Sequence, residues 1–206
     1  MIFIATIGMD SLFYAKITEG TNGDETYSLP KILAKAIKAD LSIELAEAEL
    51  YADDALAHAI KLFKSGKLSL GVEDIGVEAA SDLTGASVDD NGVLIAAGED
   101  AGCLVAIGFR ALKPNNKYRH FWLYRVKFAV PSTNLQTKGD SIQFQTPVVE
   151  GTIMQRNKLD AQGKHPWKAE ATEGDPGIDA AVLAAWFTKV YEPAFDKTSR
   201  TGGKTA

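Results

Sequence analysis

The chain has 206 residues, of which 46% are hydrophobic and 24% charged, and its formal net charge is −5. This composition is ordinary for a globular protein, and the length suits one large domain or two small ones. The acidic balance excludes a general nucleic-acid binder, which needs excess Lys and Arg to neutralise phosphates. A single cysteine excludes an intrachain disulfide framework. No apolar run approaches the roughly 18 residues that span a bilayer, so we expect no membrane partner.

The first part of the chain predicts strands. Residues 2–18 read as a strand with an irregularity near Gly8–Asp10, and turn-forming residues follow at 20–24. Apolar and polar residues alternate over 37–45, which predicts a half-buried strand. The apolar N-terminus lacks the basic start of a signal peptide, so we expect a protein made in the cytosol.

The segment 45–66 is ambiguous. Its Ala, Leu, Glu and Lys residues are good helix formers, and propensity favours a helix over 53–64 with Asp53 or Asp54 as N-cap. The alternation over 67–72 nevertheless predicts a strand directly after it. We interpret 45–66 as a long excursion between strands and leave its conformation open.

The middle of the chain predicts a helix, a hairpin and a strand. Residues 77–84 favour a short helix that ends at Gly85 in the C′ position. Residues 88–95 contain Asn-Gly, which suits a type I′ turn and predicts a β-hairpin. Residues 103–112 predict a strand in which the Cys103 thiol is buried.

The most distinctive stretch is 118–130, YRHFWLYRVKFAV. Period-two patterning with aromatic and β-branched residues predicts a strand about twice the usual length. One face consists of Tyr118, His120, Trp122, Tyr124, Val126, Phe128 and Val130. Because a strand this long rarely fills a small private core, it suggests a sheet that continues across a subunit boundary.

Two further strands are expected. Residues 141–154 predict a long strand in which Pro147 marks an edge or a bulge. One face of this strand consists of Ile142, Phe144, Val148 and Met154. A short strand is expected near 167–172.

The last predicted element is an amphipathic helix. Asp179 is a plausible N-cap, and Glu192-Pro193 ends the helix. Its apolar stripe consists of Val182, Leu183, Trp186, Phe187, Val190 and Tyr191. We expect a single domain over 1–197 and a mobile tail over 198–206.

No motif points to catalysis or to a metal. The chain has three isolated histidines: His58, His120 and His165. They have no metal-ligand spacing. Three acidic pairs could bind calcium in principle: Asp53-Asp54, Asp89-Asp90 and Glu99-Asp100. A calcium loop needs carboxylates at alternating positions, and the Asp89 pair is better explained by its hairpin. The terminal Gly-Gly-Lys-Thr lacks the rest of a phosphate loop. We predict no catalytic, cofactor-binding or metal-binding residue and no cofactor.

The three tryptophans leave a binding module open as an alternative. Trp122 and Trp186 are predicted to pack inside the protein, whereas Trp167 is expected to be the most exposed. An exposed platform around Trp167 would suit a monomeric β-sandwich that binds a glycan or another small ligand. An enzyme on a β scaffold is the third reading, and nothing singles out its residues.

Several stretches in order resemble the major tail protein, or tail tube protein, of long-tailed siphophages and related prophages of Gram-positive hosts. They are AIKADLSIE (36–44), LYADD (50–54), FKSGKLSLGV (63–72), VDDNGVL (88–94), AIGFRAL (106–112), FWLYRVKF (121–128), TPVVEGTIM (146–154) and AWF (185–187). The resemblance covers about residues 1–193. No single stretch is specific alone, and the ordered set carries the resemblance.

The resemblance implies a mainly β protomer, a β-sandwich or barrel with a flanking helix, and no catalytic residues. It implies that six protomers form a ring, that rings stack into a tube, and that DNA passes through it without specific binding. Tape-measure and tail-completion proteins are expected partners, and the virion tail is the expected location after assembly in the host cytoplasm. The excursion 45–66 is then expected to contact the neighbouring ring. Its polar composition predicts that it is mobile in a free protomer and ordered on assembly.

Overall fold

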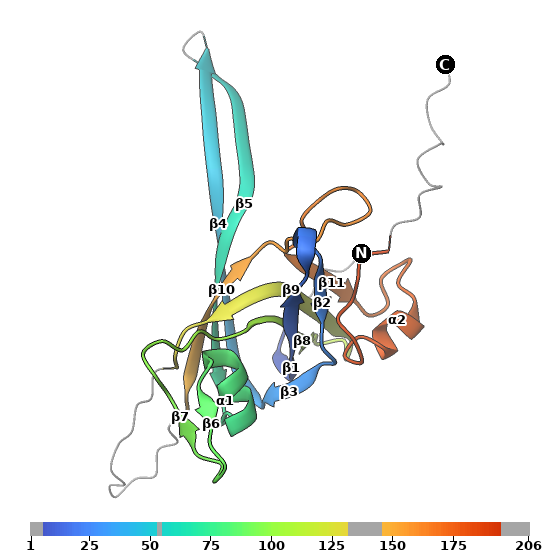
Figure 1. Cartoon of the computed structure of the whole chain (residues 1–206). Coiled ribbons are helices and arrows are strands. Elements are labelled where there is room, and N and C mark those ends of the chain that lie inside the picture. Colours follow the sequence, from blue (N-terminus) through green and yellow to red (C-terminus); the bar gives the residue numbers. More distant parts are fainter. Residues whose placement is uncertain (1–5, 53–54, 132–145, 195–206) are drawn as a thin grey trace, which may run out of the picture.

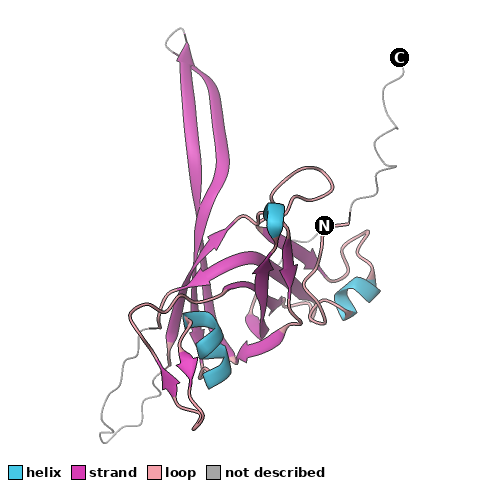
Figure 2. Cartoon of the chain, viewed as in Figure 1, coloured by secondary structure: helices cyan, strands magenta, loops and turns pink. Residues whose placement is uncertain are grey.

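The computed structural model describes residues 6–52, 55–131 and 146–194. The protein is mainly β, as predicted (Figure 2). The strands are β1 (Gly8–Glu19), β2 (Glu25–Tyr27), β3 (Lys31–Ala34), β4 (Ala36–Ala52), β5 (Ala55–Val72), β6 (Ser87–Val88), β7 (Leu94–Ile95), β8 (Leu104–Leu112), β9 (Tyr118–Phe128), β10 (Val148–Met154) and β11 (Lys168–Thr172). The helices are α1 (Val77–Thr84) and α2 (Ala180–Ala184), and Thr21–Gly23 forms a 3-10 turn.

Nine strands form one antiparallel sheet that closes on itself (Figure 1). The strand order is β2-β1-β8-β9-β10-β5-β4, with β11 on β9 and β3 on β1. β3 and β4 are separated by the single residue Lys35. Because β3 pairs with β1 and β4 pairs with β5, the two ends of the strand order are joined and the sheet closes. This closure makes a barrel, the second of the two predicted arrangements.

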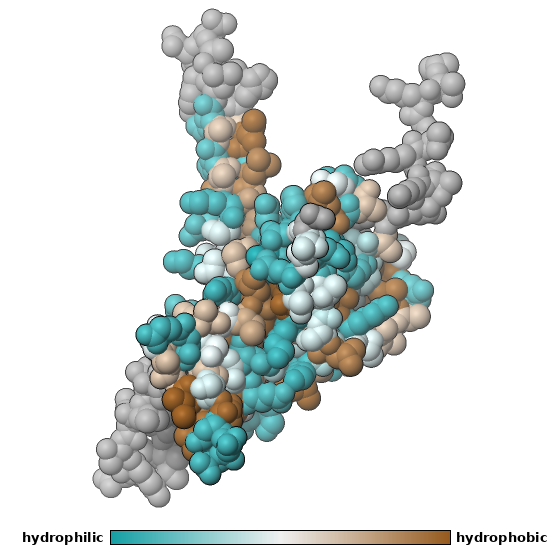
Figure 3. All heavy atoms as spheres, in the orientation of Figure 1, coloured by the Kyte–Doolittle hydropathy of each residue, from teal (hydrophilic) through white to brown (hydrophobic). Residues whose placement is uncertain are grey.

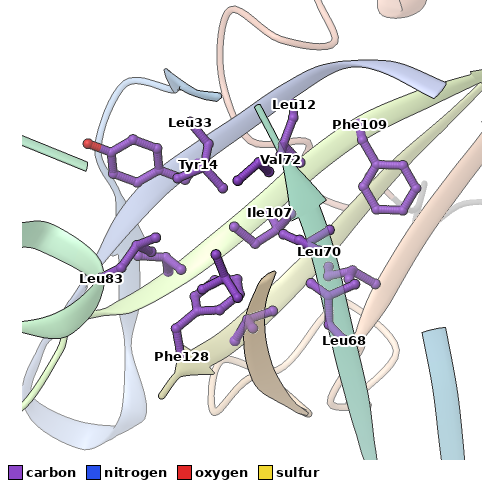
Figure 4. Packing of buried hydrophobic residues seen from close by; sticks show 14 of the residues in the cluster. Leu12, Tyr14, Leu33, Leu68, Leu70, Val72, Leu83, Ile107, Phe109 and Phe128 are labelled. Carbon is purple, nitrogen blue, oxygen red and sulfur yellow. The ribbon is translucent and has the colours of Figure 1, made fainter. Parts of the chain in front are cut away.

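The inside of the barrel is the main core (Figure 4). Leu12, Leu68 and Ile107 come from three different strands and are each at most 1% exposed. Helix α1 covers one end of the barrel with Leu83, which is fully buried. The hydroxyl of Tyr14 donates to Asp82 of α1 at 2.9 Å and ties the helix to β1.

A second core lies on the outer face of the barrel wall, beneath α2 and the chain that follows it. Trp122 and Tyr124 of β9 are fully buried there against Trp186. The Trp122 ring N–H donates to the backbone carbonyl of Trp186 at 3.0 Å. The packing role predicted for Trp122 and Trp186 is therefore confirmed.

Helix α1 has the predicted boundaries, and Gly85 ends it with a φ of 84°. The hairpin after it also forms, but the predicted turn type is wrong. A type I′ turn centred on Asn91-Gly92 needs positive φ at both residues, and of these two Gly92 alone has it. The Asp89 carboxylate instead accepts the backbone N–H groups of Asn91 and Val93, at 2.9 and 2.8 Å, and organises the loop.

The long strand β9 forms, but its single predicted face is wrong. Val105 pairs with Val126 and Ile107 with Leu123, so Tyr124 and Arg125 together oppose one residue of β8. This bulge turns the strand over. Trp122 and Tyr124 therefore face the outer core, whereas Val126 and Phe128 face the barrel interior.

The length of β9 suggested a sheet that continues across a subunit boundary, and β9 itself is not an open edge of the sheet. One edge of β9 pairs with β8. Its other edge pairs with β11 over Arg119–Leu123 and with β10 over Arg125–Phe128. Both edges of this strand are thus used within the chain.

The irregularity predicted near Gly8–Asp10 in β1 is confirmed at the adjacent Ser11, which has a φ of 56°. Two other predictions need correction. In β10 the residues facing the core are Val149 and Ile153, not Val148 and Met154. Helix α2 is shorter than predicted because its regular turns stop at Ala184, and the buried Trp186 and Val190 lie in the irregular chain after it. Residues 141–145 and the tail 198–206 lie outside the described residues.

Candidate assembly surfaces

The strands β4 and β5 form a hairpin that projects from the barrel as an arm (Figure 1). They pair with each other from Ala36 to the arm's end. β10 supports β5 over 66–71 alone, so the ladder beyond Ser65 has two strands. We use "arm" below for residues 44–52 and 55–65. Propensity favoured a helix over 53–64, and this expectation is wrong for the described residues, which are strand.

The two faces of the arm differ in composition. Ala46 opposes Leu62 and Ala48 opposes Ile60, so these four side chains share one face. Ile60 and Leu62 are 56% and 63% exposed. We call this set the apolar strip, and the space-filling view shows hydrophobic atoms along the arm beside hydrophilic ones (Figure 3).

The other face of the arm makes its contacts near the barrel. The ring of Phe63 stacks on Trp167, with ring centroids 4.6 Å apart and an interplanar angle of 4°. Trp167 is therefore partly buried, but it is the most exposed of the three tryptophans, as predicted, since Trp122 and Trp186 are 0% and 3% exposed. Farther out, Glu47 and Lys61 form an exposed ion pair at 3.0 Å, and pairs of this kind add about 0–1 kcal/mol.

The outer edge of the hairpin is open. Among the described residues, β5 is the one strand that pairs with β4. The predicted half-buried strand over 37–45 is also more exposed than expected, because the barrel covers β4 at its start alone. Leu41, Ile43 and Leu45 remain 40%, 36% and 46% exposed. An open edge beside exposed apolar side chains favours association with another chain.

The remaining sequence candidates lie apart from one another. His120 is buried against Trp186 and Phe187, and burial together with nearby Arg110 lowers the pKa of its ring. The ring Nδ1 of His165 lies 2.9 Å from the backbone oxygen of Arg156. The side chain of His58 and residues Asp53-Asp54 lie outside what the structure describes. No group of three or more His, Cys, Asp or Glu side chains arranged for a metal occurs among the described residues.

Cys103 is exposed, which contradicts the predicted buried thiol. It lies just before β8, at the end of the barrel, where the backbone N–H of Cys103 donates to the Asp82 carbonyl at 3.0 Å. The alternation of β8 buries side chains from Val105 onward and does not reach back to this position.

A buried ionic cluster, which sequence reasoning missed, anchors the chain after α2. Arg156 is 1% exposed and donates to Glu192 at 2.8 Å, while its guanidinium lies 5.0 Å from the Tyr124 ring. Nearby, Arg125 pairs with the fully buried Glu25 of β2. The two partners of each pair lie far apart in sequence, so no local sequence pattern predicts the contact between them. The pairs join distant parts of the chain, and loss of either partner of a buried pair is destabilising.

An apolar groove of about 350 Å³ lies along α2. Its lining consists of Ala181, Val182, Ala185, Trp186, Lys189, Val190, Tyr191 and Glu192. A small-ligand site of this size usually holds several convergent polar groups that orient the ligand. Here Lys189 and Glu192 are the two charged members of the lining, so the groove offers little to orient a sugar.

In the part of the chain that the structure describes, no helix is long and apolar enough to cross a membrane. No protein-family model matches the sequence, and no curated protein matches it. Among solved structures, the chain is similar to a chain of the anti-feeding prophage baseplate, determined by cryo-EM with six-fold symmetrisation. The sequence identity is 7% and the TM-score 0.37, over 82% of this chain and 97% of the other.

Proposed function

We propose that this chain is a structural virion protein that forms the tail tube of a long-tailed phage or prophage. Protomers assemble into rings, which the sequence resemblance implies to be hexameric, and the rings stack into a tube that delivers DNA. The single observation that carries the proposal is the arm, which leaves the barrel with an apolar strip and a strand edge that no described part of the chain covers.

The arm supports self-assembly for an energetic reason. A two-stranded ribbon is marginally stable in water unless one of its faces is packed. The apolar strip, Ile60 and Leu62 above all, has no such packing within the described residues. A contact between this arm and a different surface of the next copy is heterologous, and a heterologous contact that does not close generates a filament.

The acidic balance supports the role of a DNA conduit. Duplex DNA carries about one negative charge per 1.7 Å, so a basic lumen would retain it, whereas a net charge of −5 favours free passage. The lumen is accordingly neutral or acidic, the protein has no enzymatic activity, and tape-measure and tail-completion proteins are its other partners. A tube with a strongly basic lumen would contradict this part of the proposal.

The test is direct imaging of the purified chain. Negative-stain electron microscopy over a concentration series, with light scattering alongside, should reveal rings or hollow tubes. A protein that stays strictly monomeric at high concentration would contradict unaided self-assembly. The glycan-binding alternative loses its main support, because Phe63 covers the Trp167 ring that was expected to form the platform.

A further inference from the structure

The chain that contains α2 covers the outer face of the barrel and is separate from the main core. We call residues 180–192, which comprise α2 and the chain directly after it, the cap segment (Figure 1). Its packed side chains belong to the outer core, and none of its residues, all of which the structure describes, belongs to the core inside the barrel. These side chains are Leu183, Trp186, Phe187, Val190 and Tyr191. The cap segment can therefore leave the barrel without unpacking the main core.

Side chains, and not strand pairing, hold the cap segment on the barrel. Within the described residues, the backbone N–H groups of residues 182, 183, 185, 186 and 188 donate to carbonyls of the segment itself or of its N-cap residue. Phe187 stacks on Phe13 of β1, with ring centroids 4.8 Å apart. Arg156 donates to Glu192 at 2.8 Å. Because no strand pairing has to break, release of the cap segment should cost less free energy than unfolding of the barrel.

His120 of β9 lies beneath the cap segment with an unpartnered ring nitrogen. Its side chain is 6% exposed, and its ring centroid lies 5.9 Å from the rings of both Trp186 and Phe187. No hydrogen-bond partner reaches its Nδ1 atom within the described residues. A neutral imidazole donates from one nitrogen alone, whereas an imidazolium is charged and donates from both. The closed cap segment therefore favours the neutral ring, because a buried charge without partners is costly.

The charged groups near His120 do not compensate for a proton on its ring. Arg110 of β8 pairs directly across from His120 and repels a positive ring. Asp10 of β1 attracts that ring, but the Arg110 guanidinium binds this carboxylate. Glu173, which follows β11, also attracts the ring and accepts the backbone N–H of Tyr118 at 3.1 Å. The cap segment contacts His120 through uncharged rings. Burial, together with Arg110, lowers the pKa of His120 below its ordinary value.

We propose that His120 is a proton switch for the cap segment: when its ring takes up a proton, residues 180–192 leave the outer face while the barrel stays folded. Opening lets water reach the imidazolium, so the proton stabilises the opened state selectively. The stability of the closed state is fully present above the ordinary histidine pKa of about 6.5. It is lost progressively as the pH falls from there toward the lowered pKa of the closed state. The switch lies within one protomer and does not depend on the tail-tube proposal.

Hydrogen exchange of the wild-type chain and of His120→Phe tests the switch. Phenylalanine keeps an aromatic ring beneath the cap segment and removes the titrating group. The protection of amides 182–188, corrected for the intrinsic effect of pH on exchange, measures opening of the cap segment. In the wild type it should fall about tenfold between pH 7.5 and 5.5, because the opened state gains a proton below about pH 6.5. In His120→Phe it should stay constant. The β8 amides measure global unfolding and should be better protected than the cap segment at both pH values.

The matched control is His165→Gln, which removes a different histidine and keeps a donor for the Arg156 carbonyl. This control should respond to pH as the wild type does. Protection of the cap segment that is independent of pH in the wild type would overturn the proposal, and so would an equal fall in His120→Phe. Cap amides as well protected as those of β8 would also overturn it, because the segment would then open only with the barrel. The β8 protection at pH 7.5 verifies that His120→Phe is folded, and His120→Leu replaces it if it is not.

Discussion

Replacing the apolar strip with residues of equal strand propensity should abolish assembly without unfolding the protomer. The perturbation is Ile60→Thr with Leu62→Thr, because threonine keeps the β-branched shape that strands favour. Both side chains are more than half exposed in the protomer, at 56% and 63%. Surface changes of this kind usually alter the free energy of unfolding by no more than about 0.5 kcal/mol.

The effect on association follows from the same exposed fractions. Fully burying a Leu or Ile side chain contributes about 1.5–3 kcal/mol. The part still exposed here is worth roughly 1–2 kcal/mol per residue when a second copy covers it, or about 2–4 kcal/mol for both. Since 1.4 kcal/mol is tenfold in an equilibrium constant, the contact should weaken roughly 30- to 700-fold.

Light scattering against concentration measures the critical concentration for assembly, and urea unfolding measures protomer stability. Leu159→Thr is the matched control, since Leu159 is 53% exposed in the loop between β10 and β11 and is not part of the strip. The double variant should need a much higher concentration to assemble, whereas the control should not. The reasoning fails if the double variant assembles at the wild-type concentration, because the strip would then remain in water in the assembly.

Two further predictions concern the stability of the barrel. Gly108→Ala should destabilise the protein by about 1–3 kcal/mol, because a Cβ there would lie 2.7 Å from the buried Trp122 ring, whereas Gly98→Ala, with nothing within 4 Å, should be neutral in the same urea unfolding assay. His120→Phe should reduce the loss of stability in acid. Burial lowers the pKa of His120, so as the pH falls below about 6.5 the unfolded chain binds a proton that the folded chain resists. Unfolding free energies at pH 7.5 and 5.5 should therefore differ less in the variant, and equal differences would contradict the assignment.

The elements that the sequence predicted well are those with a local cause. Helix α1 and its end at Gly85 follow from a short helical pattern and a residue free to adopt positive φ. The Asp179 side chain caps α2 as predicted, accepting the N–H of Ala181 at 2.8 Å. The short strand β11 and the strand over 67–72 follow from period-two alternation that the barrel then buries on one side.

The arm was harder to predict because two local signals oppose each other. Ala, Leu, Glu and Lys favour a helix by propensity, yet Ala46-Glu47-Ala48-Glu49 alternates with a period of two, which indicates a strand. Propensity is a weak prior that tertiary context overrides. Here the context is the partner strand, since β4 and β5 pair along almost their whole length.

The buried ionic cluster has no local signal at all. Glu25 and Arg125 are one hundred positions apart, and charged residues are rarely fully buried unless they are paired. Composition would place both side chains on the surface. Only the pairing of strands in the order β2-β1-β8-β9 brings Glu25 of β2 and Arg125 of β9 together, so this part of the structure follows from the fold and not from a motif.

One irregularity in β5 links the barrel to the proposed assembly surface. Ser65 pairs with Glu44 while Phe63 pairs with Leu45, which leaves Lys64 as an extra residue. Without that bulge, Leu62 would share a face with Leu68 in the barrel interior. With it, the even-numbered apolar residues before Lys64 turn to the opposite face, and the strip they form is exposed. A single added residue thus lets one strand contribute to the core of its own protomer and present apolar side chains to another.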